Sequence, residues 1–337
     1  MKDVAALAGV SVSTVSRVVN GTDVDAALTH RVREAAQLLG YRRDHAASTL
    51  RRADRQSGSL GLIFEDVSNP LFSVVHRGVE DVARSRGVLT FAASSDDDPD
   101  AERELAQAFS ERGVDGLIIV PAGEDQSYLM REREAGTAIV FVDRPPRLLE
   151  ADTVLTDNAD GVRRAVARLV EGGHRRIGFL GDRQRIFTAA ERYRGFREAL
   201  AAHGIEEDPG SVRLDLYDSE VAHDAARDLL KGSNAPTALL AGQNLITIGA
   251  VHALRELDLE QTVALIGFDD LTLADLLEPG LTVVAQDPVA LGRRAAELVF
   301  DRLDGYDGPA RSAVIPTTLI ARGSGELPPP PADRRAQ

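Results

Sequence analysis

Residues 11–17 place short hydroxyl side chains and one guanidinium on a single predicted helical face. Ser13, Thr14, Ser16 and Arg17 lie opposite the valines of the same segment, and Ser11 precedes them as a good helix N-cap. Hydroxyls and a guanidinium suit hydrogen bonding to phosphates and to base edges in the major groove of DNA. The pattern therefore indicates a nucleic-acid contact surface.

Two short helices joined by a turn would position this face. The first is predicted to begin at an Asp3 N-cap and to end near Gly9, and the second to run from Val12 to about Asn20. Two such helices joined by a Gly-containing turn are typical of the helix-turn-helix motif. The same geometry occurs in proteins that bind no nucleic acid, so a small three-helix cap with a polar face is the alternative interpretation.

A third helix completes this N-terminal head. It is predicted to begin at an Asp25 N-cap and to end at Leu39, with Gly40 as the C′ residue. The basic segment 41–52 that follows is weakly helical and too short to be stable alone. Residues 53–59 have the composition of a linker into a second domain.

Charge is distributed unevenly along the chain. The 337 residues carry a formal net charge of −14, which taken whole argues against binding a polyanion. Residues 1–56, however, contain nine Lys and Arg against six Asp and Glu, a net of +3 that leaves −17 on the rest. A small basic head on a large acidic body is compatible with DNA binding by the head alone.

Composition excludes several other classes of protein. The sequence has no Cys, so disulfides, thiolate metal sites and a Cys nucleophile are excluded. It shows neither the apolar core of a signal peptide near its first residue nor an apolar run of about 18 residues. We therefore expect no secretory leader, no membrane span and a cytoplasmic location.

The remainder of the chain alternates apolar runs with helical patterns. The apolar runs predict strands at 60–64, 88–92, 117–120, 138–142, 177–180, 212–216, 237–241 and 263–266. Because these strands are continuously apolar, they indicate parallel sheets covered by helices on both faces. Two such series predict two doubly wound α/β subdomains, whose ligands would bind beyond the carboxyl ends of the strands.

The last elements are predicted to return to the first subdomain. They are a helix over 288–303 and a strand at 313–315, and the proline-rich end is predicted to be disordered. The predicted domains are 1–44 for the helix-turn-helix head, 45–58 for a hinge helix and linker, 59–156 with 286–315 for the first subdomain, 157–285 with 316–323 for the second, and 324–337 for the tail.

Motifs in both parts of the chain resemble one known family. KDVAALAGVSVSTVSRVVNG at 2–21, followed by a third helix ending in LGY, is similar to the head of the LacI/GalR family of bacterial transcription regulators. In the body, SNPLF at 68–72, VDRP at 142–145, ERYRGFREAL at 191–200 and ALIGFDD at 264–270 resemble motifs of the same family. The resemblance covers residues 1–323 and implies an all-α head followed by a periplasmic-binding-protein-like α/β body.

The resemblance implies two kinds of DNA contact. In the predicted second helix, Val12, Ser13 and Arg17 would read bases, and the residues that would contact phosphates or cap the helix are Ser11, Thr14, Ser16 and Asn20. The segment 46–50, with Ala47 and Leu50, resembles a hinge helix that folds when two copies meet in the minor groove. Leu50 matches the apolar wedge that enters the central base step.

Three departures from the family pattern concern this head. Arg42-Arg43-Asp44 stands where the family usually has x-Pro-Asn, and Ser48 stands at a hinge position that is usually Arg. Leu28-Thr29 replaces a usual Thr-Arg, which removes a phosphate contact. These changes bear on the affinity for DNA more than on whether DNA is bound.

The resemblance also implies an effector cleft between the two subdomains. Arg192 occupies a family position at which a planar guanidinium binds adjacent ligand hydroxyls or a carboxylate. Its alternative role is a surface ion pair with Glu191 or Glu198. Asn244 stands where the family usually has Asp, so it keeps an acceptor, adds donors and loses a charge. The implied effector residues are Asp66, Phe72, Asp143, Arg144, Arg192, Tyr217, Asn244 and Asp269.

Two of these assignments have alternatives of nearly equal weight. Asp269 would either contact the ligand or cap the helix that follows it. Phe72 and Tyr217 are candidates for stacking on a ligand ring because the chain has no Trp, although Phe72 would fit the core nearly as well.

Nothing in the sequence indicates catalysis, a metal or a cofactor. The seven His form neither an H-x-x-x-H nor an HExxH pair, and neither GxSxG, Walker A nor a GxGxxG after a strand occurs. The cluster Asp96-Asp97-Asp98 is interpreted as a helix cap and a solvated loop rather than a metal site. We therefore expect no enzyme activity.

The combined prediction is a transcriptional repressor controlled by a small, sugar-like effector. Two heads would bind the halves of a pseudo-palindromic operator, which requires a homodimer or a tetramer. A solute-binding transport protein shares the two-lobed body but would need a signal peptide and no helix-turn-helix. A sugar- or nucleotide-modifying enzyme would need a nucleophile, metal or cofactor loop, although fold alone does not exclude it.

Overall fold

The computed structural model describes residues 1–19, 24–41 and 57–331, and it separates into two compact units. The first unit comprises Met1–Ser57 and the second Gly58–Gln337. Each is described by itself. Among the helices in the described ranges, none combines the length and the apolar character that a membrane crossing would require.

The first unit is a three-helix head. Its helices are α1 (Lys2–Ala8), α2 (Val12–Val19) and α3 (Ala26–Leu38), which pack around a core of Val4, Ala5, Ala8, Val15, Val32 and Ala35. Helix α1 begins two residues earlier than the sequence predicts, because Met1 is its N-cap and Asp3 lies in its first turn.

Two other caps follow the sequence prediction. The Ser11 hydroxyl accepts a hydrogen bond from the Thr14 amide at 3.1 Å, and the Asp25 carboxylate accepts from the amides of Ala27 and Leu28. Arg31 of α3 donates to the Ala8 carbonyl at 2.5 Å and so satisfies an orphan acceptor at the end of α1. This contact joins the third helix to the turn between the first two.

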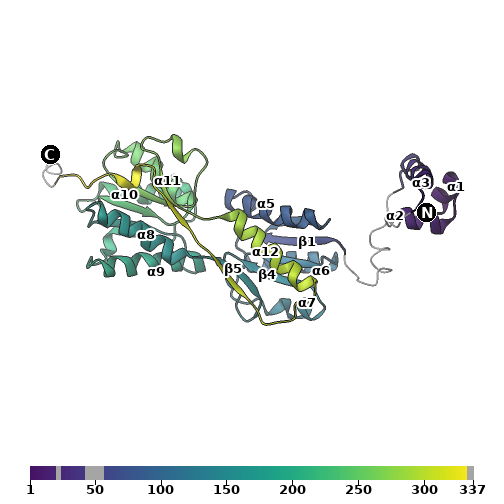
Figure 1. Ribbon diagram of the computed structural model, residues 1–337. Helices are drawn as coiled ribbons and strands as arrows, with labels where there is room; N and C mark the ends of the chain where they lie inside the picture. The colour runs from purple at the N-terminus through teal and green to yellow at the C-terminus, as the bar shows by residue number, and fades with distance from the viewer. Residues whose placement is uncertain (20–23, 42–56, 332–337) are drawn as a thin grey trace. The chain divides into compact units, whose positions relative to one another are not determined.

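The second unit contains two six-stranded sheets, and its two subdomains are visible in Figure 1. The first sheet has the order β11-β5-β4-β3-β1-β2. Its strands are β1 (Ser59–Phe64), β2 (Leu89–Ser94), β3 (Gly116–Ile119), β4 (Ala138–Val142), β5 (Asp152–Thr156) and β11 (Ser312–Ile315). All of its pairings are parallel.

The second sheet has the order β12-β10-β9-β8-β6-β7. Its strands are β6 (Ile177–Leu180), β7 (Val212–Arg213), β8 (Ala238–Ala241), β9 (Ala264–Phe268), β10 (Thr282–Ala285) and β12 (Thr318–Ile320). The β12–β10 pairing is antiparallel and the others are parallel. The chain crosses between the sheets after β5, after β10 and after β11.

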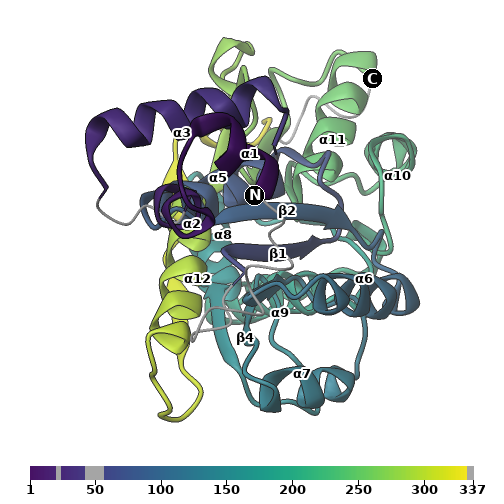
Figure 2. The same ribbon diagram turned by 90° about the vertical axis from the view of Figure 1, so that its right-hand side faces the viewer.

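Helices cover both faces of each sheet. The first subdomain has α5 (Pro70–Ser85), α6 (Pro99–Glu111), α7 (Met130–Glu134) and α12 (Pro288–Leu303). The second has α8 (Asn158–Glu171), α9 (Phe187–Ala202), α10 (Ser219–Lys231) and α11 (Asn244–Glu256). Figure 2 shows α5 and α12 on one side of the first sheet and α6 on the other. Strand β11 pairs with β5 in this sheet, and α12 packs beside α5.

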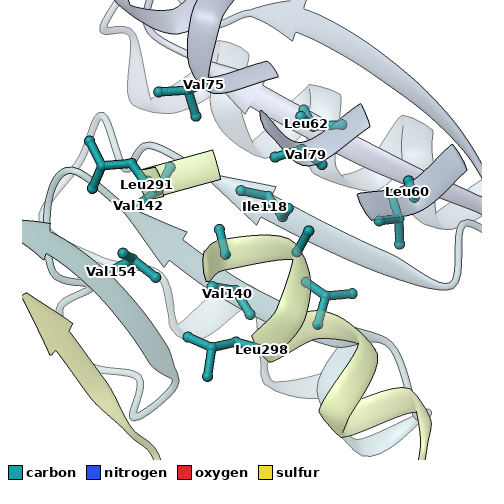
Figure 3. Close-up of a cluster of buried hydrophobic side chains, with 14 of the residues drawn as sticks. Leu60, Leu62, Val75, Val79, Ile118, Val140, Val142, Val154, Leu291 and Leu298 are labelled. Carbon is teal, nitrogen blue, oxygen red and sulfur yellow. The ribbon is translucent and has the colours of Figure 1, made fainter. Parts of the chain in front are cut away.

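The core of the first subdomain lies between its sheet and the α5–α12 pair. One cluster of buried side chains contains Leu60 and Leu62 of β1, Val79 of α5, Val140 of β4 and Leu298 of α12 (Figure 3). The two helices approach closely at Gly292, where a Cβ atom would lie 2.0 Å from the Val75 carbonyl oxygen. Only glycine fits this crossing, which sets the position of α12 over the sheet.

The structure differs from the sequence prediction in several strands and in the tail. Strands β5, β10 and β12 are not predicted, and β7 spans two residues where five are predicted. Residues 324–326 form a short 3-10 helix where disorder is predicted, because Ser324 accepts from the Thr282 amide at 2.9 Å and donates to the Leu265 carbonyl at 2.6 Å. His174 Nε2 lies 2.8 Å from the Leu327 carbonyl oxygen, which anchors the next residues.

Candidate functional site: a polar cleft between two subdomains and an exposed helical face

Loops at the carboxyl ends of the strands enclose a cavity between the two subdomains, which we call the cleft cavity. The first subdomain contributes Glu65, Asn69, Leu71, Phe72, Asp143 and Arg144. The second contributes Asp182, Ile186, Thr188, Ala189, Arg192, Gly242, Gln243, Asn244 and Asp269. The open volume is about 40 Å³, room for very few water molecules, so the cleft is closed around its own side chains.

Arg144 binds carboxylates on three sides. Its guanidinium donates to Glu65 and, at 2.7 Å, to Asp97, and its Nε lies 3.6 Å from an Asp143 oxygen. Burial alone would lower the pKa of Arg144, but Glu65, Asp143 and Asp97 together raise it. Burial raises the pKa of Glu65, and Arg144 offsets part of that rise. The Nε proton is buried and makes no hydrogen bond in the described part of the chain.

Asp97 joins the two subdomains. Besides Arg144, it pairs with Arg185 at 2.5 Å and lies 3.6 Å from Arg183, and both of these arginines belong to the second subdomain. Only 5% of Asp97 is exposed, so the predicted solvated loop is wrong at this residue, although Asp98 caps α6 as predicted. Sequence reasoning missed this role. Asp97 lies just beyond the end of β2, at a positive φ of 59°.

We expect Asp97→Asn to loosen the closed cleft. The change keeps the size of the side chain but leaves three guanidinium groups without their shared carboxylate, which should cost about 2 kcal/mol after allowance for the exposure of Arg185. Thermal unfolding of the chain should show a Tm lower by roughly 4–8 °C. Asp96→Asn is the matched control, since Asp96 is exposed, has φ 52° and should tolerate Asn. Equal Tm values for the two variants would contradict the role of Asp97.

Arg192 is held inside the cleft rather than on the surface. Its Nε donates to Asn158 at 2.7 Å and its Nη1 to the Gly242 carbonyl at 2.9 Å, while the guanidinium lies 3.7 Å from the centre of the Phe268 ring. The alternative ion pair does not form, because Glu191 and Glu198 pair with Arg194 instead. Within the described residues Nη2 makes no hydrogen bond, so this prong remains for a ligand.

Asp269 and Asn244 lie close to Arg192 in the same cavity. Asp269 accepts from Gln286 at 2.7 Å, and burial raises its pKa while Arg192 offsets part of the rise. It caps no helix, because the next helical turn, Ala274–Leu276, has Leu273 as its N-cap. Asn244 donates to Asn69 at 2.9 Å, a contact that bridges the subdomains.

The remaining sequence candidates divide between the cavity and its surroundings. Phe72 lines the cavity and also packs in the core, stacked on Phe64 at 5.5 Å between ring centres, so it has the core position, and stacking on a ligand ring stays a prediction. Tyr217 and Asp66 do not line the cavity. Tyr217 is 53% exposed with Arg183 6.0 Å from its ring centre, and the Asp66 carboxylate accepts from the Ser68 amide.

The candidate DNA-contact residues lie on or beside α2. Ser11, Val12, Ser13 and Arg17 are exposed, Thr14 and Ser16 are half-buried, and the buried Val15 faces the core. Asn20, Ala47 and Leu50 lie outside the described residues. The polar face predicted from the sequence is therefore present on α2, which presents hydroxyls and a guanidinium to solvent.

The chemistry of the cleft fits a hydroxyl-rich ligand. Carboxylates, amides and two buried guanidinium groups converge there, each able to donate to or accept from hydroxyls. Across the ranges that the structure describes, no group of three or more His, Asp or Glu side chains could hold a metal ion. A helix-turn-helix head combined with this two-lobed body defines the class of DNA-binding regulators that carry a ligand-binding domain.

Comparison with known proteins identifies the family. The model described as bacterial regulatory proteins, lacI family, matches residues 1–44, and a periplasmic binding protein-like domain matches residues 166–325. The HTH-type transcriptional regulator CelR of Thermobifida fusca is 34% identical over 334 residues, 96% of this chain and 97% of CelR. The ribose operon repressor of Haemophilus influenzae is 29% identical over 96% of this chain and 98% of its own.

Solved structures show the same architecture. A CelR–cellobiose complex has a TM-score of 0.72 at 31% identity, over 96% of this chain and 98% of that chain. A lac repressor dimer bound to operator and the anti-inducer ONPF has a TM-score of 0.83 at 24% identity over 96% and 98%, which shows a shared fold. This chain belongs to the LacI family of bacterial transcriptional regulators.

Proposed function

We propose that this protein is a repressor whose affinity for operator DNA is set by a sugar or sugar derivative in the cleft cavity. The observation that carries the proposal is the convergence of Arg192, Asp269 and Asn244 with Arg144 and Asp143 between two subdomains. These groups offer forked donors and carboxylate acceptors, which vicinal hydroxyls require. The solved complex of the related CelR with cellobiose supports a saccharide ligand.

We assign DNA binding to the head and to the segment that follows it. Arg17, Val12 and Ser13 would contact base edges, and the residues placed on phosphates or helix caps are Ser11, Thr14, Ser16 and Asn20. Ala47 and Leu50 would form the minor-groove contact of a hinge within 45–58. Two copies of the chain would bind the two halves of a pseudo-palindrome, since a two-fold protein fits a two-fold site.

The effector would act on the arrangement of the two subdomains. We assign 59–156 with 286–315 to the first and 157–285 with 316–323 to the second, and Asp66 and Tyr217 to the approaches of the cleft. A ligand in the cleft must separate contacts such as Asn69–Asn244 before it can enter. A coupling of about 1–3 kcal/mol between cleft and head would change operator affinity 5–150-fold.

A thermal-shift screen tests the proposal directly. The full chain is screened against sugars, sugar phosphates and nucleosides, and each hit is retested for its effect on operator binding. A ligand at 100 times its Kd should stabilise the folded protein by about 2.7 kcal/mol. A sugar or sugar derivative that both raises Tm and changes operator affinity supports the proposal, whereas a screen in which no compound has both effects would contradict it.

We further propose that the protein works in the cytoplasm and performs no catalysis. The support is the membership in a family of transcriptional regulators and the closed cleft, in which the acidic groups pair with arginines. Turnover of a bound sugar by the purified chain would contradict this.

A further inference from the structure

A second cavity adjoins the cleft cavity and is formed by both subdomains. The two cavities share Arg144 and Ile186 as wall residues, and the second has an open volume of about 210 Å³ against about 40 Å³ for the first. We call it the outer chamber. A ligand that extended from the cleft cavity into the outer chamber would pass the side chains of Arg144 and Ile186, which border both.

The walls of the outer chamber combine apolar rings with the charged side chains of Glu124, Arg144, Arg147 and Arg185. Pro99, Pro121 and Pro145 of the first subdomain face Phe187, the first residue of α9. Flat apolar surfaces of this kind pack against the C–H faces of a pyranose or furanose ring, with a few polar groups to orient it. The chamber therefore offers packing to a second ring, whereas the cleft cavity offers hydrogen bonds.

The cations beside the outer chamber are already neutralised. Arg144 and Arg185 both pair with Asp97, and Arg147 lies 3.2 Å from a Glu124 oxygen. A phosphate or carboxylate on the ligand would compete with these carboxylates and repel them. An uncharged sugar ring would not be repelled by these carboxylates.

We propose that the effector is an uncharged two-ring saccharide, with one ring in the cleft cavity and the second in the outer chamber against Phe187. This inference rests on the proposed function. Arg144 borders both rings, and its partnerless Nε–H donates to an oxygen at the junction. Phe187 is thereby a specificity-determining residue, which selects the two-ring ligand over its one-ring counterpart.

Matched pairs of ligands test this with the full chain. Binding is measured by titration calorimetry for glucose with cellobiose and maltose, galactose with lactose and melibiose, xylose with xylobiose, and glucose 6-phosphate. We expect at least one disaccharide to bind ten or more times more tightly than its monosaccharide. Phe187→Ala should reduce that disaccharide's affinity about tenfold and change the monosaccharide's less than threefold, and Phe187→Tyr, which keeps the ring, should restore the preference.

The outcomes separate the two proposals. Binding of no sugar in the panel would overturn the saccharide effector and this inference together. A monosaccharide or glucose 6-phosphate that binds as tightly as any disaccharide would overturn the two-ring ligand alone. A disaccharide preference that Phe187→Ala leaves unchanged would remove the second ring from the outer chamber. The Tm of each variant, compared with that of the parent chain, shows that the fold is retained.

Discussion

Arg192→Ala should abolish the effector response and leave operator binding without effector unchanged. Arg192 is 5% exposed, and its free prong lies in the cavity beside Asp269 and Asn244. A hydrogen bond to a charged group contributes about 1.5–3 kcal/mol, so the loss of the bond from this prong reduces effector affinity by roughly 10–150-fold. Calorimetric titration measures the affinity for the effector. Operator-binding curves, recorded with and without effector, measure the response and the effector-free affinity for DNA.

Controls on the same helix separate this role from a loss of folding. Arg194→Ala removes a guanidinium two residues away that pairs with Glu191 and Glu198 on the surface, and it should leave the response intact. Arg192→Lys keeps a charge beside the buried Asp269, so the fold should be retained, but the planar fork is lost and the response should still fall at least tenfold. A responsive Arg192→Ala protein would exclude Arg192 from the site.

Arg17→Ala should weaken specific DNA binding much more than non-specific binding. The guanidinium is exposed on α2 opposite the buried Val15, the position from which a recognition helix reaches a base edge. One bidentate contact to a guanine discriminates by about 1–3 kcal/mol, so affinity for the operator should fall roughly 5–150-fold for each half-site. Non-specific binding, which depends on phosphate charge, should fall only a few-fold.

The measurement compares operator and unrelated duplex at several salt concentrations. Arg33→Ala is the matched control, because Arg33 is also an exposed arginine of the head but lies on α3. It should lower both affinities slightly and equally. An equal loss for both duplexes in Arg17→Ala would assign Arg17 to a phosphate instead of a base.

Local patterns predict most of the elements in this chain. Asn69-Pro70 and Asp98-Pro99 begin α5 and α6 as predicted. The side-chain oxygen of Asn69 or Asp98 accepts a hydrogen bond from a backbone amide in the first turn, which has no partner within the helix. Strand β5 escapes prediction because its apolar run is short and begins with a charge. Asp152 is buried there only because Arg302 and Arg311 of distant segments each reach it at 2.8 Å.

The candidate site is predictable to a similar extent. Arg192, Asn244 and Asp269 follow from motifs, and the structure brings all three into one cavity. Asp97 does not follow, because its partners Arg144 and Arg185 are 47 and 88 residues away in the sequence. A role that depends on two subdomains meeting leaves no pattern in its own neighbourhood.

The three crossings of the chain between the sheets are hydrogen-bonded to one another, and one of them is bonded to a residue of the cleft. Thr156, before the first crossing, donates to Gln286 of the second at 2.6 Å, and Gln286 donates in turn to Asp269. Asp157 accepts from the Thr317 amide of the third crossing at 2.6 Å. The crossing segments, about which the two subdomains would rotate, therefore lie beside the cleft. The cleft is close to this axis of rotation, and the far end of each subdomain is distant from it. A sub-ångström shift at Asp269 would then become a larger displacement at the amino end of the first sheet's strands, where the chain enters β1 at Ser59.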